Sequence, residues 1–218
     1  MNRNVAASAL LALALGACAS QPEEKLAAPS GADQVVLTRQ QGGKFLAFVG
    51  PKLQHSPPFL GVGGTNYYCL RSWLDTRNGE AAHQVYVSDS YFGAPRRWDG
   101  AHDADGKDLR FISISRNEID CDQGCSYFDE FAADLPEELL RAHRTAGLTV
   151  TFTAGAGQTL TVAVPARQIA EELTALDTTR TALAANTAPA QQTPPASAPA
   201  TPATPAPAAA PAATSPAK

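Results

Sequence analysis

Apolar and polar residues alternate along much of the middle of the chain, which is the pattern of half-buried β-strands. Residues 148–153 alternate large apolar side chains with threonines, and residues 160–164 repeat the alternation after a glycine-containing turn at 155–157. The pattern predicts a hairpin with one buried face and one wet, threonine-rich face.

Short apolar runs on either side of turn residues predict further strands. The cue at Asn78-Gly79 is the strongest, because this dipeptide fits the tight turns that join antiparallel strands. The predicted pairs are 35–37 with 45–49, 67–75 with 83–89, and 111–120 with 126–133.

Two stretches have helical spacing instead. Residues 135–144 begin with Pro136 and two acids and end with cations, as the helix dipole favours. A second helix is predicted over 166–184, where a buried stripe recurs at helical spacing in Ile169, Leu173, Leu176 and Leu183.

These elements predict a mainly β fold, an antiparallel β-sandwich or rolled sheet with two peripheral helices. About 150 residues, 34–184, form the expected single domain. Residues 185–218 consist almost wholly of Ala, Pro, Thr and Ser, which predicts a disordered C-terminal tail with polyproline character. Residues 1–17 are interpreted as a signal peptide and residues 18–33 as an N-terminal linker.

The first twenty residues predict where the protein goes. The apolar run Val5 to Leu15 is too short for a membrane-spanning helix, and Arg3 before it is typical of a secretory signal. The following Leu15-Gly16-Ala17-Cys18 resembles the lipobox of bacterial lipoproteins. An ordinary signal cleaved nearby, with Cys18 incidental, is the alternative.

The resemblance implies lipidation of Cys18 with cleavage before it, and therefore membrane attachment through a lipid anchor. In such lipoproteins Ala19 after the cysteine favours the outer membrane, with the domain facing the periplasm. Lys218 at the end of the tail is also similar to the terminal lysine of peptidoglycan-linked lipoproteins. A wall tether through Lys218 and a simple spacer are both open.

The net charge of the chain limits which classes of partner it can bind. The formal net charge is −4, and loss of Arg3 with the signal makes it −5. An acidic chain argues against a nucleic-acid partner.

The most suggestive internal motif is Cys121-Asp122-Gln123-Gly124-Cys125, at the base of a predicted hairpin loop. In an oxidising envelope it predicts a Cys121–Cys125 disulfide. A redox-active pair has a different spacing, and a soft-metal site of these cysteines with a histidine is a further alternative. Cys69 is then a free, buried thiol, unless it pairs with one of the other two cysteines.

Other motifs are weaker. A nucleophilic Cys69 needs a nearby histidine, and His55, His83, His102 and His143 are scattered in the sequence. Residues 99–108 are rich in aspartate, but a calcium loop with Gly106 as its sixth residue lacks two ligands, so Asp-Gly turns are favoured. Gly61–Gly64 is interpreted as a loop, and Arg96-Arg97-Trp98 as a surface loop with one anchoring aromatic residue rather than an anion or sugar site.

No catalytic residue, metal or cofactor is predicted. The leading hypothesis is a non-enzymatic envelope module for binding, assembly or tethering, with peptidoglycan or an envelope protein as partner. The alternatives are a periplasmic enzyme whose site is assembled from distant residues, and a metal-handling protein that uses Cys121 and Cys125.

Overall fold

The structure, a computed structural model, describes residues 24–120 and 125–187. Cys18, Cys121 and the chain from residue 188 to Lys218 lie outside the described residues. The lipid anchor, the Cys121–Cys125 disulfide, the disordered tail and the wall tether therefore stay predictions.

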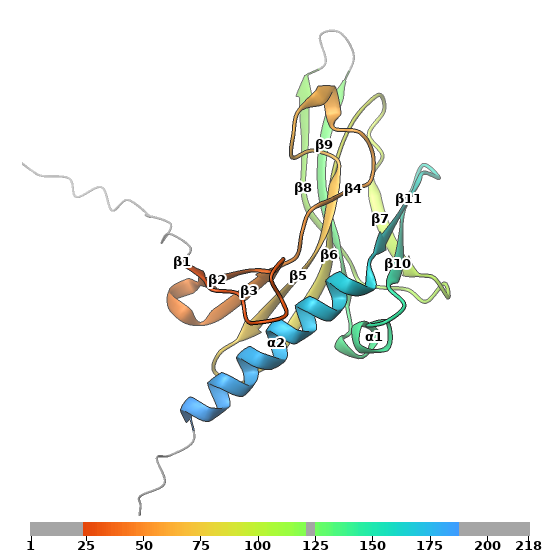
Figure 1. The fold of residues 1–218 in the computed structure, drawn as a ribbon. Helices are drawn as coiled ribbons and strands as arrows, with labels where there is room; N and C mark the ends of the chain where they lie inside the picture. The colour runs from red at the N-terminus through yellow and green to blue at the C-terminus, as the bar shows by residue number, and fades with distance from the viewer. Residues whose placement is uncertain (1–23, 121–124, 188–218) are drawn as a thin grey trace, which may run out of the picture.

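Most strands belong to one large antiparallel sheet (Figure 1). Its order is β1-β2-β3-β5-β6-β9-β8, and the short β4 also pairs with β5. The strands are β1 (Glu24–Leu26), β2 (Val36–Gln40), β3 (Phe45–Val49), β4 (Leu53–Gln54), β5 (Tyr67–Asp75), β6 (Ala81–Phe92), β8 (Phe111–Asp120) and β9 (Ser126–Leu135).

A second sheet has the order β11-β10-β7 and packs on one face of the large sheet. It consists of β7 (Trp98–Asp103), β10 (Leu148–Ala154) and β11 (Thr159–Val164). The upper parts of β5, β6, β8 and β9 extend as a long projection, which we call the arm (Figure 1).

Two helices complete the part of the fold outside the arm, which we call the body. The short α1 (Glu137–Ala142) follows β9, and α2 (Ala166–Thr187) runs along the large sheet in contact with β3 and β5. Arg141 of α1 binds Asp177 of α2, and Arg180 of α2 binds Glu137 of α1, so charged pairs join the helices on their solvent side.

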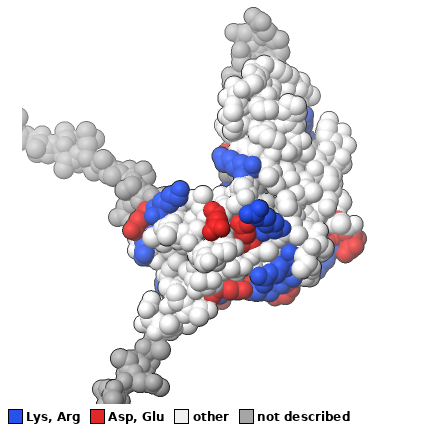
Figure 2. Space-filling view, viewed as in Figure 1, with Lys and Arg blue, Asp and Glu red and all other residues white. Residues whose placement is uncertain are grey.

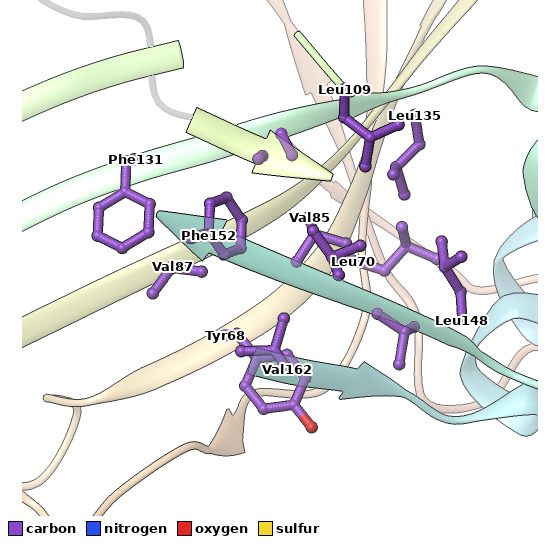
Figure 3. Close-up of a cluster of buried hydrophobic side chains, with 14 of the residues drawn as sticks. Tyr68, Leu70, Val85, Val87, Leu109, Phe131, Leu135, Leu148, Phe152 and Val162 are labelled. Atoms are coloured by element: carbon purple, nitrogen blue, oxygen red, sulfur yellow. The ribbon is translucent and has the colours of Figure 1, made fainter. Parts of the chain in front are cut away.

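The main core lies between the two sheets (Figure 3). Val85, Val87 and Phe131 of the large sheet face Phe152 and Val162 of the small one. A second apolar cluster lies under α2, where Leu176 packs with the aliphatic and aromatic residues of β2, β3 and β5.

The predicted fold class is confirmed: the described chain is mainly β, with antiparallel sheets and two helices. The four predicted hairpins form, and α2 ends three residues beyond the predicted boundary. Sequence patterns missed β1, β4 and β7. Glu24–Leu26 and Leu53–Gln54 are too short to show a period, and glycine and aspartates interrupt Trp98–Asp103.

Within residues 24–120 and 125–187, no helix has the length and apolar character needed to cross a bilayer.

Candidate functional site

Apolar side chains are exposed together at the end of the arm, where η2 (Phe59–Gly61) lies beside the ends of β8 and β9 (Figure 1). Leu60 is 74% exposed, Phe92 59% and Val62 56%. The rings of Phe59 and Phe92 are 4.7 Å apart, which joins the loop to the end of β6. We call Phe59, Leu60, Val62 and Phe92 the apolar tip.

The loop that carries the tip, residues 55–66, supplies many of its own hydrogen-bond partners. The amide of Phe59 donates to Thr65 Oγ1 at 2.8 Å, and this hydroxyl donates to the carbonyl of Val62 at 2.7 Å. The amides of Gly61 and Val62 donate to carbonyls within the loop. These bonds leave fewer polar groups that need water, so the loop can enter an apolar environment at lower cost.

Asn66 fixes this loop to the sheet. It is buried, adopts a left-handed backbone conformation with φ of 55°, and donates through Nδ2 to the carbonyl of Pro57. Its Oδ1 accepts the amide of Ser90 on β6 at 2.6 Å. The ring of His55 also contacts the carbonyl of Ser88, with 2.9 Å between Nε2 and the oxygen. The tip is therefore held at both ends of its loop.

A buried polar block supports the arm beneath the tip. Asp89 of β6 and Asp129 of β9 are direct register partners, and each is 2% exposed. Like charges in this arrangement repel, so each carboxylate needs a cation or strong donor. Arg96 binds Asp89 at 2.7 Å, and Arg116 binds Asp129 at 3.3 Å.

Tyr91 connects this block to the tip. Its hydroxyl donates to Asp129 Oδ2 at 2.8 Å and accepts the amide of Arg96. Burial raises the pKa of Tyr91 to about 12, so the phenol stays a donor at neutral pH. Because side chains alternate along a strand, an inward Tyr91 turns Phe92 to the outside.

The segment Arg96-Arg97-Trp98 is part of this support. Trp98 is 4% exposed and donates through Nε1 to Asp89 Oδ2 at 3.1 Å, so it is the predicted anchoring residue. The Arg96 guanidinium is engaged by Asp89 and lies over the Tyr91 ring.

Charged side chains are distributed unevenly between the arm and the body. On the face shown in Figure 2, the arm is almost uncharged, whereas Lys, Arg, Asp and Glu gather on the body around α2. The loop at 55–66 has no Lys, Arg, Asp or Glu at all.

A second unusual place lies at the root of the arm, where polar side chains are buried between the two apolar clusters. Ser72 of β5 and His83 of β6 face each other across the strands, with 2.7 Å between Ser72 Oγ and His83 Nδ1. The other ring nitrogen, Nε2, lies 3.5 Å from Glu137 Oε2, which is too long for a good hydrogen bond. We call Ser72, His83 and Glu172 the polar seam.

Glu172 of α2 is the most deeply buried member. Its side chain is 0% exposed, and neither carboxyl oxygen makes a hydrogen bond within the described residues. Burial raises the pKa of this carboxyl well above its usual value, and the proximity of Ser72 offsets only part of the effect. The group is therefore neutral over much of the acidic range.

Burial and the neighbouring carboxylate shift the pKa of His83 in opposite directions. Burial lowers the pKa of His83, while the Glu137 carboxylate opposes this shift. The guanidinium of Arg180, with that of Arg141, holds the pKa of Glu137 at about 2. His83 is therefore a neutral imidazole beside an ionised carboxylate at neutral pH.

The order Ser72, His83, Glu137 is similar to a nucleophile, base and acid. Ser72 is, however, 0% exposed and His83 2% exposed, so a substrate does not reach the hydroxyl in this structure. The arrangement does not supply the accessible nucleophile that an acyl-transfer enzyme needs.

The other sequence-derived candidates are separate. Cys69 is free and buried, as predicted, and burial raises its pKa to about 11, which keeps it a thiol. His102 contacts the carbonyl of Asp103, and His143 that of Gly147. Asp103 accepts the amides of Asp105 and Lys107, which makes the predicted turn. No group of three potential metal ligands occurs among the described side chains.

Sequence reasoning missed both the tip and the seam. A search for similar proteins adds no precedent for either place: no family model, no curated protein and no solved structure matches the chain.

Proposed function

We propose that this chain is a lipid-anchored, non-enzymatic binding module of the bacterial envelope. Its lipid is on Cys18, its membrane is the outer membrane, and its domain faces the periplasm. The resemblance of residues 15–18 to a lipobox supports the anchor. The partner is an envelope protein with an apolar surface that receives the apolar tip.

The observation that carries the proposal is the exposure of the apolar tip on a well-fixed loop. Contiguous apolar side chains at a surface are typical of interaction sites. Burial of a Leu, Val or Phe side chain that is fully exposed contributes about 1.5–3 kcal/mol, so the tip is a strong energetic anchor. A loop that is already ordered also loses little entropy on binding.

The strand register supports a protein partner rather than the anchoring membrane. β1 contains Lys25, which lies in one row with Ala82 of β6 through the pairs of β2, β3 and β5. Phe92 is ten residues farther along β6, about 33 Å at ~3.3 Å per residue. Six residue-to-residue separations join Cys18 to Glu24, and a fully extended chain of this length spans at most ~21 Å. When the arm points away from the membrane, the tip therefore lies out of reach of that membrane.

In vivo crosslinking with Leu60→Ser/Val62→Ser tests the proposal. Wild-type protein in its native envelope should give a discrete crosslinked protein species, and the tip variant should lose it. Val36→Ser and Ile114→Ser are matched controls, because Val36 is 40% exposed and Ile114 42% exposed at other places. They should retain the species.

Two results would contradict the proposal. Equal crosslinking of the tip variant and the controls would show that the tip is not the docking site. Tip-dependent binding of the Cys18→Ser chain to protein-free lipid vesicles would identify a bilayer as the occupant instead.

The anchor is tested separately. Cys18→Ser should accumulate as an unprocessed precursor without acyl chains, measured by mass spectrometry and membrane fractionation. If this variant matures and fractionates like wild type, Cys18 is not the lipidated residue.

A further inference from the structure

A cleft of about 600 Å³ lies at the root of the arm, beside the first turn of α1. Its apolar part consists of Leu109, Leu135 and Leu139 with Pro136 and Ala82. The volume is in the range of sites that hold small organic molecules. The cleft is far along β6 from Phe92, so it is separate from the apolar tip.

His83 gives this cleft a polar anchor. It lines the cleft, is 2% exposed, and has one ring nitrogen bound to Ser72. The other nitrogen, Nε2, is buried and lies 3.5 Å from Glu137 Oε2, and it has no hydrogen-bond partner among the described residues. A buried polar atom without a partner costs free energy, and a ligand that hydrogen-bonds to it recovers that cost.

The rest of the lining is acidic. Asp108 and Glu138 are exposed at the cleft, whereas Arg110 is engaged by Asp134. Four carboxylates and two cations line the cleft, which gives a formal charge of −2: Asp103, Asp108, Asp134 and Glu138 against Lys107 and Arg110. This field favours a cationic ligand over an anionic one.

We propose that the cleft binds a small amphipathic amine. The apolar body of the ligand covers the leucines, its ammonium group lies near Asp108 and Glu138, and a hydroxyl or similar group at its other end hydrogen-bonds to His83 Nε2. This site is independent of the docking function proposed for the tip.

Titration of the full Cys18→Ser chain with n-octylammonium, followed by NMR, tests the site. The affinity for n-octanoate, which has the same apolar body and the opposite charge, should be at least ten-fold lower. Ala82→Phe enlarges an exposed residue of the cleft lining and should weaken n-octylammonium binding at least ten-fold. Ala156→Phe, an exposed substitution in a distant turn, should leave it unchanged.

The two polar contacts have their own tests. Asp108→Asn/Glu138→Gln should weaken n-octylammonium binding up to about five-fold, as expected for exposed charges. 8-Amino-1-octanol carries a terminal hydroxyl that n-octylammonium lacks. It should bind no more weakly than n-octylammonium, because His83 Nε2 pairs with the hydroxyl. In a cleft that offers no such partner, burial of the hydroxyl would lower the affinity. A ten-fold loss would remove His83 as the anchor.

Equal binding of the amine and the carboxylate, or no effect of Ala82→Phe, would overturn the proposal. Wild-type stability of Ala82→Phe, measured by thermal unfolding, shows that the cleft and not the fold was changed.

Discussion

The two ends of the arm depart from ordinary burial in opposite ways. At the apolar tip, large apolar side chains are exposed, while at the root the polar seam places a serine, a histidine and a glutamate inside. A partner that covers the tip removes its cost, because burial of apolar surface is favourable. The cost of the seam lies within the fold, because its polar atoms have already lost water.

Hydrogen bonding separates the two regions further. The loop of the tip pairs amides, carbonyls and side chains within itself, as the bonds of Phe59, Thr65 and Asn66 show. In the seam, His83 Nε2 and both oxygens of Glu172 have no hydrogen-bond partner in the part of the chain that the structure describes. The tip is therefore a surface that an outside partner could bury without breaking hydrogen bonds of the loop, whereas the seam can affect stability and its dependence on pH.

The largest effect is expected from Glu172→Gln. The folded carboxyl keeps its proton at pH values where the unfolded chain, with a pKa near 4.5, has released it. Unfolding then releases a proton, so this group lowers the free energy of unfolding by about 1.4 kcal/mol for each pH unit above that value. The loss continues until the folded carboxyl ionises.

Glu172→Gln removes this titration, so its stability relative to wild type should rise with pH. Denaturant unfolding at pH 5, 6 and 7 measures the difference. The lowered pKa of His83 acts the other way, since it makes stability rise as pH approaches 6.5, but it is common to both proteins. Glu138→Gln, at an exposed position, is the control. A pH-independent difference for Glu172→Gln would show that this carboxyl is ionised in the fold.

The next effect tests the Ser72–His83 hydrogen bond. Ser72→Ala should lower the free energy of unfolding by about 1–3 kcal/mol, because it leaves the buried Nδ1 of His83 without its partner. Ser88→Ala is a matched control on β6: Ser88 is also 0% exposed, but its hydroxyl has no hydrogen-bond partner within residues 24–120 and 125–187. Its loss should be close to neutral. Equal losses in the two variants would refute a special role of the Ser72–His83 contact.

The sequence predicted the elements better than the sites. Alternation at 148–153 and the turn at Asn78-Gly79 identified real hairpins because each signal is local. Ser72 faces His83 only in one register of the β5–β6 hairpin. The turn residues indicate that register only when the length of the loop is also known. Glu172 had a signal that was missed: it lies three residues after Ile169 and four before Leu176, on the buried face of α2.

The tip was hidden for a different reason. A loop of Pro, Phe, Leu, Val and Gly gives no period, and exposure of Leu60 or Phe92 depends on where distant strands end. The stretch Gly61–Gly64 was interpreted only as a loop. Phe59, two residues before this stretch, contacts Phe92, which lies 33 residues farther along the sequence, so no local pattern indicates the cluster.

The smallest change in the free energy of unfolding is expected from Leu60→Gly. This variant tests whether the exposed leucine of the tip lowers the stability of the fold. Leu60 has φ of 51°, a left-handed conformation that costs an L-residue about 1–2 kcal/mol. Glycine relieves this strain but has more freedom to lose on folding, so the net gain should be at most about 1 kcal/mol. Chemical denaturation of wild type and variant measures it.

Val62→Gly is the matched control, because Val62 is also exposed but has φ of −75°. It has no such strain to relieve, so it should lose about 0.5–1 kcal/mol. Both variants remove an apolar side chain from the tip and should weaken the envelope crosslink. A more stable Leu60→Gly protein that no longer crosslinks is the outcome expected if the tip serves a partner, since stability is often given up at functional sites. If Leu60→Gly instead loses as much stability as Val62→Gly, the left-handed leucine is not strained and exposure alone distinguishes the tip.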